Sequence, residues 1–111
     1  EEAAAAQVNL TDADFSNQDL QGASLSGCSL IGACFDGADL EGADLSSCRL
    51  NGASFRDAEL KGAKLQDASL IWCDFSHASL NKANLCCTLL QGANLKEATL
   101  QKADLSGANL Y

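Results

Sequence analysis

The chain has 111 residues, enough for one domain with a modest core, and its formal net charge is −8. Residues 1–48 contain nine acidic side chains and no Lys or Arg, whereas residues 49–111 contain six acidic and seven basic side chains. This balance argues against direct nucleic-acid binding, which needs clustered basic side chains. No apolar run reaches the roughly eighteen residues of a membrane-spanning helix, so we expect no membrane insertion.

The first segment, residues 1–7, reads Glu-Glu-Ala-Ala-Ala-Ala-Gln. Alanine and glutamate are good helix formers, and acidic residues at the start suit the positive end of a helix dipole. We therefore expect either a short N-terminal helical cap or a frayed tail ahead of the main domain, which covers residues 8–111.

From residue 10 to residue 110, every fifth residue is Leu or Phe without interruption. The position two residues before each of these holds mostly Ala, with Cys at three places, and all nine glycines lie two residues after. The phenylalanines recur every twenty residues and are predicted to form the structural core; they are Phe15, Phe35, Phe55 and Phe75. The sequence is thus a five-residue repeat with a super-period of four repeats.

A period of five fits neither a helix nor an ordinary strand. It fits a short extended stretch followed by a turn whose last residue tolerates positive φ, as Gly, Asn and Asp do. Four such turns close one square coil, with the large and small residues of each repeat filling its interior. Coils stacked at about 4.8 Å would form an all-β, four-sided solenoid of about five coils.

Two stretches carry a family resemblance. Ala-Asp-Leu-Glu-Gly at 38–42 and Ala-Asn-Leu-Lys-Glu at 93–97 resemble the A(D/N)LxX motif of pentapeptide repeat proteins. The resemblance covers residues 8–111 and implies the right-handed quadrilateral parallel β-helix of that family. The motif is structural, and it implies no catalytic residue.

The chemistry of the chain points away from catalysis. A filled interior leaves no concave site, and the sequence has one His and no glycine-rich phosphate loop. We therefore predict no enzyme, no cofactor and no metal site. His77 shares a column with Asp57 and Glu97, and we interpret it as a solvated side chain near acidic neighbours.

The six cysteines fall into two groups. Three take the inward position that usually holds Ala and are interpreted as buried, reduced fillers: Cys28, Cys48 and Cys73. Cys34 and Cys86 are expected to point outward as the reactive thiols, with Cys87 at a corner. A Cys28–Cys48 or a Cys86–Cys87 disulfide stays open, and the pattern leans towards a reducing compartment.

Two opposite sides of the predicted solenoid differ in character. One carries a candidate acidic face: Asp19, Asp39, Glu41 and Glu59. Like charges stacked one strand apart repel each other, so these acids are either solvated at low cost or retained for binding.

The opposite side carries a candidate protein-binding patch: Ile31, Ile71, Trp72, Leu89 and Tyr111. Trp72 stands where the turn favours Gly, and breaks of this kind in a regular repeat are where function tends to lie. Exposed apolar clusters and Trp are typical of interfaces. The alternative interpretation is a tolerated surface substitution.

The sequence therefore predicts a non-catalytic scaffold that presents flat faces to a protein partner. The family resemblance implies an alternative, because some pentapeptide repeat proteins are acidic, dimeric DNA mimics that bind DNA gyrase or topoisomerase. An uncapped last coil suggests a homodimer through the C-terminal end. The cytoplasm is slightly favoured as the location, with the thylakoid lumen or periplasm as alternatives if Glu1 is a processed N-terminus.

Overall fold

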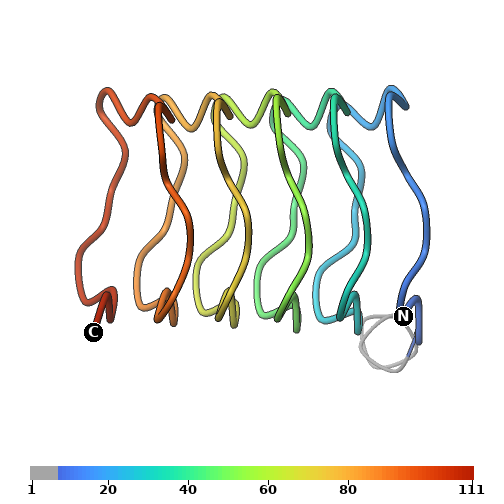
Figure 1. Cartoon of the computed structure of the whole chain (residues 1–111), viewed down its shortest axis with the longest axis horizontal. Coiled ribbons are helices and arrows are strands. Elements are labelled where there is room, and N and C mark those ends of the chain that lie inside the picture. Colours follow the sequence, from blue (N-terminus) through green and yellow to red (C-terminus); the bar gives the residue numbers. More distant parts are fainter. Residues whose placement is uncertain (1–7) are drawn as a thin grey trace.

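The computed structural model describes residues 8–111 as a stack of coils that runs from one end of the molecule to the other (Figure 1). The five complete coils are coil 1 (8–27), coil 2 (28–47), coil 3 (48–67), coil 4 (68–87) and coil 5 (88–107). The predicted cap, residues 1–7, lies outside the described residues. No helix long and apolar enough to cross a membrane occurs among residues 8–111.

Each repeat ends in a tight turn, as the glycine positions predicted. In a typical repeat, the backbone N–H of Ala33 donates to the carbonyl of Leu30 at 3.0 Å, and Gly32 between them has a φ of 71°. The same position in every other described turn also has positive φ, whether or not it holds Gly. The predicted left-handed corner is therefore confirmed throughout the stack.

Neighbouring coils pair in parallel, in a register of twenty residues. Every bridge joins one residue per repeat to its equivalent in the next coil, from Asn9↔Ser29 to Leu89↔Asn109. Within residues 8–111 these are isolated bridges, with no longer strand and no helix. A turn every five residues leaves each side of the coil too short for a longer ladder, which explains the low strand content of an all-β fold.

Three backbone hydrogen bonds per repeat tie adjacent coils together, two of them forming the bridge itself. Leu30 donates to the carbonyl of Arg49 at 2.7 Å, and Gly32 donates to that of Asn51 at 3.0 Å. The bridging residue itself donates back to the preceding coil, as Arg49 does to Cys28 at 3.1 Å. Stability therefore accumulates through contacts between adjacent coils.

The core is the column of large side chains along the solenoid axis. The rings of Phe35 and Phe55 stack with centroids 4.8 Å apart and planes 5° from parallel, and those of Phe55 and Phe75 are 4.9 Å apart. Phe15 stacks on Phe35 at 5.2 Å but is only partly buried, because the coil that stacks on it, coil 2, lies on one side only. The four phenylalanine rings form one column, and Leu95 continues it in coil 5.

Candidate functional site: two opposite faces of the coil stack

The four flat sides of the stack differ in the residues that they expose. We call the neutral face the side whose outward residues flank Leu10, Leu30, Leu50, Leu70, Leu90 and Leu110. We call the bipolar face the opposite side, whose outward residues flank Leu20, Leu40, Leu60, Leu80 and Leu100. The candidate patch belongs to the neutral face and the candidate acidic residues belong to the bipolar face.

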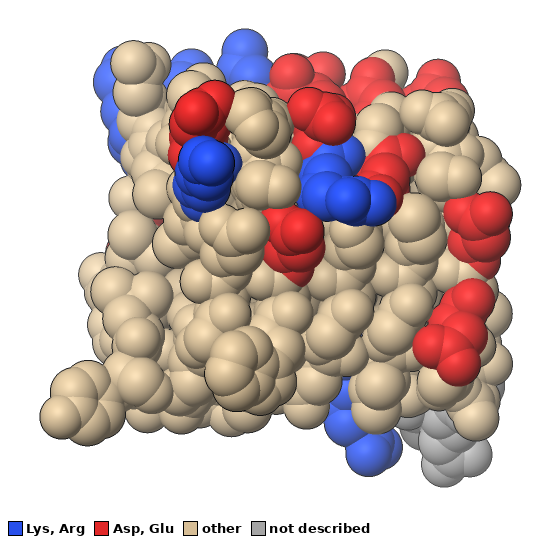
Figure 2. Space-filling view, in the orientation of Figure 1, with Lys and Arg blue, Asp and Glu red and all other residues tan. Residues whose placement is uncertain are grey.

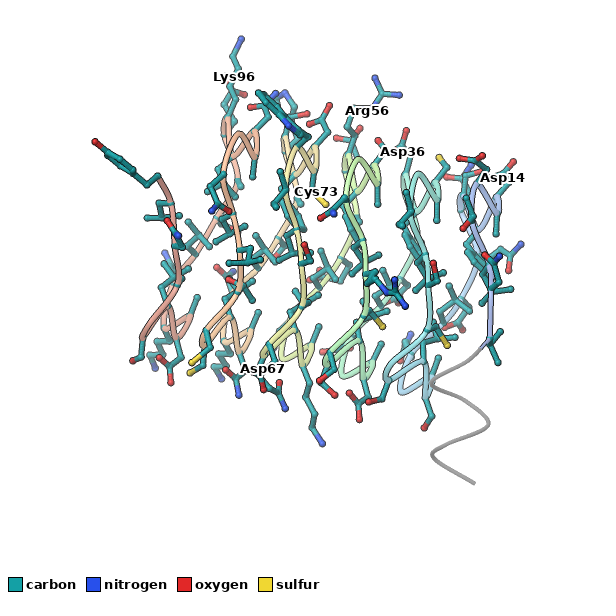
Figure 3. The ribbon with its side chains drawn as sticks, turned by 90° about the horizontal axis from the view of Figure 1, so that it is seen from below. Asp14, Asp36, Arg56, Asp67, Cys73 and Lys96 are labelled. Atoms are coloured by element: carbon teal, nitrogen blue, oxygen red, sulfur yellow. The ribbon has the colours of Figure 1, made fainter. Side chains whose placement is uncertain are left out.

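The neutral face carries few charges. Asp12 and Arg49 are the charged residues among its outward positions from residue 9 to residue 111. Figure 3 looks towards this face, with Asp36 and Arg56 of the adjoining side along one edge and Asp67 along the other. In Figure 2 the same face forms the lower boundary, where tan side chains dominate. This depletion of charge distinguishes it from the rest of the surface.

The members of the candidate patch are exposed to different degrees. Trp72 is 73% exposed and Tyr111 fully exposed, while Ile31 and Leu89 are each a little more than one third exposed. Ile71 is half-buried, so it contributes less outward surface than the sequence interpretation assumed. Four of the five predicted residues thus present substantial apolar area on one face.

Trp72 places a large side chain at a corner position that favours glycine. It has a φ of 63°, a conformation that costs an L-residue with a side chain about 1–2 kcal/mol. Its indole extends towards coil 5, because a Cβ built on Gly92 would lie 2.5 Å from Cε3 of the ring. A Cβ on Gly52, one coil in the other direction, would meet nothing within 4 Å. The indole therefore covers one neighbouring glycine and leaves the other open.

The bipolar face changes sign along the stack. The acidic side chains beside its central leucines occur in coils 1 to 3, and its basic side chains, Lys61 and the corner residues Lys82 and Lys102, occur in coils 3 to 5. The corner at the opposite edge carries Asp57 and Glu97. Figure 2 shows this change of sign along its upper edge, where acidic side chains lie towards the N-terminal end and basic side chains towards the C-terminal end. The column of residues before the central leucines indicates only the acidic half, because the lysines lie after these leucines and two of them occupy corners.

Several of these acids have a local structural role. The first residue after the central Leu or Phe has a backbone N–H that the ladder leaves without a backbone partner. On the bipolar face, Asp39 accepts this hydrogen bond from Glu41 at 3.1 Å, and Glu59 accepts it from Lys61 at 3.1 Å. Local hydrogen bonding thus offsets the repulsion within the acidic column.

Of the two ion pairs among residues 8–111, one lies on the side that flanks Phe35 and Phe55, and the other lies at the corner between that side and the bipolar face. Arg56 and Asp36 pair at 2.8 Å, and the pKa of Asp36 is lowered overall, because hydrogen bonds from Ser54 and Arg56 outweigh its desolvation. His77 Nδ1 lies 3.2 Å from Glu97 Oε1, and the ion pairs of residues 8–111 include none between His77 and Asp57. Within this part of the chain, no three His, Cys, Asp or Glu side chains gather as metal ligands.

All six thiols are free of disulfides. The thiol of Cys48 donates to the carbonyl of Leu25 and that of Cys73 to the carbonyl of Leu50, both at 2.9 Å. Burial raises the pKa of Cys48 to about 11 and that of Cys73 to about 12. The inward cysteines therefore act as buried, reduced fillers in this structure.

The outward thiols differ from the expectation in one respect. Cys34 and Cys86 are both half-buried, and Cys87 is the exposed thiol. A hydrogen bond with Asp104 raises the pKa of Cys86. Hydrogen bonds from the side chain and backbone of Ser106, with that from Cys86, lower the pKa of Asp104 to about 2. A raised pKa reduces the thiolate fraction, so Cys86 is less reactive than its outward position suggested.

Comparison with solved structures places these features in context. A pentapeptide repeat protein from the thylakoid lumen of Arabidopsis thaliana is 38% identical over 85% of this chain and 66% of its own, with a TM-score of 0.83. HetL, a pentapeptide repeat protein involved in heterocyst differentiation regulation from the cyanobacterium Nostoc sp. strain PCC 7120, is 29% identical over 90% of this chain and 58% of its own, with a TM-score of 0.70. This chain spans less than two thirds of either protein.

A plasmid-mediated fluoroquinolone resistance protein, QnrB1, reaches only 24% identity and a TM-score of 0.39, which carries no argument about function. No curated protein matches the sequence. The family model of pentapeptide repeats matches residues 9–46, 38–76 and 73–110. The expected right-handed quadrilateral β-helix is confirmed, and the chain belongs to the pentapeptide repeat family.

Proposed function

We propose that this protein is a non-catalytic scaffold whose neutral face binds a protein partner. The observation that carries the proposal is Trp72, a largely exposed aromatic side chain held at a strained corner on a nearly uncharged face. Ten other non-glycine residues share the positive φ of the corners, and what sets Trp72 apart from them is its large aromatic side chain, which is 73% exposed. Local stability alone favours glycine at this corner.

The composition of the face supports this role. Interface cores are depleted in charged residues and enriched in aromatic residues, and Trp is among the commonest residues at binding hot spots. Trp72, Leu89 and Ile31 supply exposed apolar area on a flat surface. The flatness follows from the straight twenty-residue register of the coils.

The interior supports the non-catalytic part of the proposal. Reaction sites are usually concave and combine several polar groups with shelter from water. Here the space inside the coils is filled by leucines and stacked phenylalanine rings with almost no exposure. Any chemistry would have to take place on a flat outer face.

The test compares two glycine substitutions at equivalent corners. Trp72→Gly removes the proposed anchor, and Asp57→Gly is the matched control, because Asp57 occupies the same position of its turn with a φ of 60° on another corner. Tagged proteins would capture partners from an extract of the source organism, followed by affinity measurement with the purified partner. We expect Trp72→Gly to weaken binding at least tenfold and Asp57→Gly to leave it unchanged; equal binding by all three proteins would refute the proposal.

The alternative, a DNA mimic that inhibits gyrase, is favoured by the acidic side chains of coils 1 to 3. It is opposed by Lys61, Lys82 and Lys102, because a mimic of duplex DNA needs negative charge along its whole length. A supercoiling assay with purified gyrase decides: inhibition at micromolar protein would support the alternative, and unchanged supercoiling would remove it.

The location to test first is the thylakoid lumen. The support is similarity to a pentapeptide repeat protein of the Arabidopsis thaliana thylakoid lumen, which is 38% identical. Fractionation of the source cells with an antibody against this chain would check it, and recovery in the soluble cytoplasmic fraction would contradict it.

A further inference from the structure

We propose that the bipolar face binds a second copy of this chain, giving an antiparallel dimer with two-fold symmetry. In a dimer of this kind, the same surface of each copy must complement itself. The order of charges along the face and the shape of one corner column both meet that requirement. The lysines of the face also form no ion pair within residues 8–111 and are available for contacts with a second copy.

The charges are ordered so that the face complements its own reverse. Coil 1 contributes Asp19, coil 2 contributes Asp39 and Glu41, and the last two coils contribute one lysine each. Coil 3 holds Glu59 and Lys61 beside its leucine, and the corner at the other edge adds Asp57 in coil 3 and Glu97, which pairs with His77, in coil 5. A two-fold axis that crosses coil 3, in the plane of the face and perpendicular to the stack, places coil 2 opposite coil 4 of the second copy and coil 1 opposite coil 5. Every acidic coil then meets a lysine.

The corner at one edge of this face complements itself in shape as well. In chain order its residues are Gly22, Gly42, Gly62, Lys82 and Lys102. A Cβ on any of the three glycines would meet nothing within 4 Å, so the corner is open in coils 1 to 3. The proposed axis places Lys82 of the second copy opposite Gly42, and Lys102 of the second copy opposite Gly22. Long side chains therefore face open positions.

The charged groups are available for such contacts. Within residues 8–111 the ion pairs are Arg56–Asp36 and His77–Glu97, so the lysines of the bipolar face form none. Lys82 and Lys102 are exposed and adopt positive φ of 62° and 61°. Glycine would relieve that strain, so the backbone does not explain the lysines.

The expected association is weak and depends on salt. Exposed ion pairs contribute little individually, whereas complementary charge fixes orientation and excludes wrong partners. Because the neutral face lies on the opposite side of the stack, this dimer would leave both neutral faces free. Two outward binding faces would allow bivalent binding, and avidity would strengthen the capture of a partner that offers two sites.

The experiment uses charge exchange and sedimentation. An acidic variant, Lys82→Glu with Lys102→Glu, replaces both lysines of coils 4 and 5 on this face with acidic side chains. We expect glutamate to be tolerated there, because Glu97 already occupies a corner position with a φ of 59°. A basic variant, Gln21→Lys with Glu41→Lys, changes side chains that accept no hydrogen bond from the backbone of residues 8–111. The matched control, Lys64→Glu with Lys96→Glu, makes the same change of charge on the other two sides.

We expect the natural chain to dimerise at about 0.01 M salt and to be monomeric at about 1 M salt, where the screening length falls from about 30 Å to about 3 Å. Each charge variant alone should be monomeric, an equimolar mixture of the two should form a heterodimer, and the control should behave as the natural chain. A monomeric natural chain at low salt would overturn the proposal. A dimer that persists at high salt or in the acidic variant would also overturn it. Such a dimer would point to another interface, such as the last coil.

Discussion

The indole of Trp72 lies across Gly92, the equivalent corner of the next coil. A Cβ at Gly92 would come within 2.5, 2.6 and 2.8 Å of the ring atoms Cε3, Cζ3 and Cδ2. The same relation holds where the side chains of Asp12 and Asn17 extend over Gly32 and Gly37. A side chain at these corners therefore extends towards the next coil, and glycine there makes room for it.

This contact predicts energetic coupling between the two positions. Gly92→Ala should cost about 1–2 kcal/mol from its φ of 72° alone, with a further loss because the methyl group overlaps the indole. In a Trp72→Gly background the second loss should vanish. A double-mutant cycle by urea unfolding would measure this coupling, and an equal cost in both backgrounds would show that the ring moves aside freely.

Trp72→Gly by itself should leave the free energy of unfolding unchanged or raise it, by up to about 1 kcal/mol. The substitution relieves the strain of a positive φ and removes a side chain that is 73% exposed. The measurement is the urea midpoint, with Asp57→Gly for comparison. A clear loss of stability would show that the indole serves the fold, and would weaken the argument that it is kept for binding.

Most of the fold could be predicted from the sequence because one short repeat dictates it. The twenty-residue spacing of the phenylalanines predicted the stack, and the rings of Phe35 and Phe55 do lie parallel at 4.8 Å. The position of glycine predicted the corners, which holds even where Trp72 replaces it. Each inference needed only periodicity and steric limits on φ.

The roles of the surface residues were harder to predict, because they depend on which side chains and backbone groups of neighbouring positions and coils lie next to each other. The sequence indicates only that Asp39 and its stacked acidic neighbours repel each other, whereas in the structure its carboxylate accepts a hydrogen bond from the backbone N–H of Glu41. That N–H has no backbone acceptor, which becomes evident only once every backbone hydrogen bond between the coils is known. Lys82 lies at a corner two residues after the leucine, so reading the column before the leucine missed the change of sign.

The backbone acceptor role can be tested at Asp44, whose Oδ1 accepts the N–H of Ser46 at 3.0 Å. Asp44→Ala should cost about 1–3 kcal/mol, because a partly buried N–H loses its partner. Asp44→Asn keeps a carbonyl oxygen at the same place and should cost less. Urea unfolding of both variants would check this, and equal losses would show that the charge, rather than the acceptor, matters.

The phenylalanine column predicts a graded response to shortening. Phe55→Ala should cost about 3–5 kcal/mol, since it leaves a cavity between two stacked rings. Phe75→Leu should cost clearly less, because Leu95 fills the same slot in the next coil. Thermal and urea unfolding would measure both, and similar losses would mean that the ring stack itself is essential.

The buried cysteines predict a loss of stability at alkaline pH. In the folded chain the pKa is about 11 for Cys48 and about 12 for Cys73, whereas an unfolded thiol titrates near about 8.5. A raised folded pKa means that the stabilising contribution is complete below the unfolded pKa and is lost as pH rises towards the folded value. The free energy of unfolding should therefore fall between about pH 9 and the folded pKa values. Replacing both thiols with Ala, the usual residue at that position, should flatten this part of the profile, whereas Cys87→Ala at an exposed corner should not. An unchanged alkaline slope in the double variant would show that groups other than these thiols control stability there.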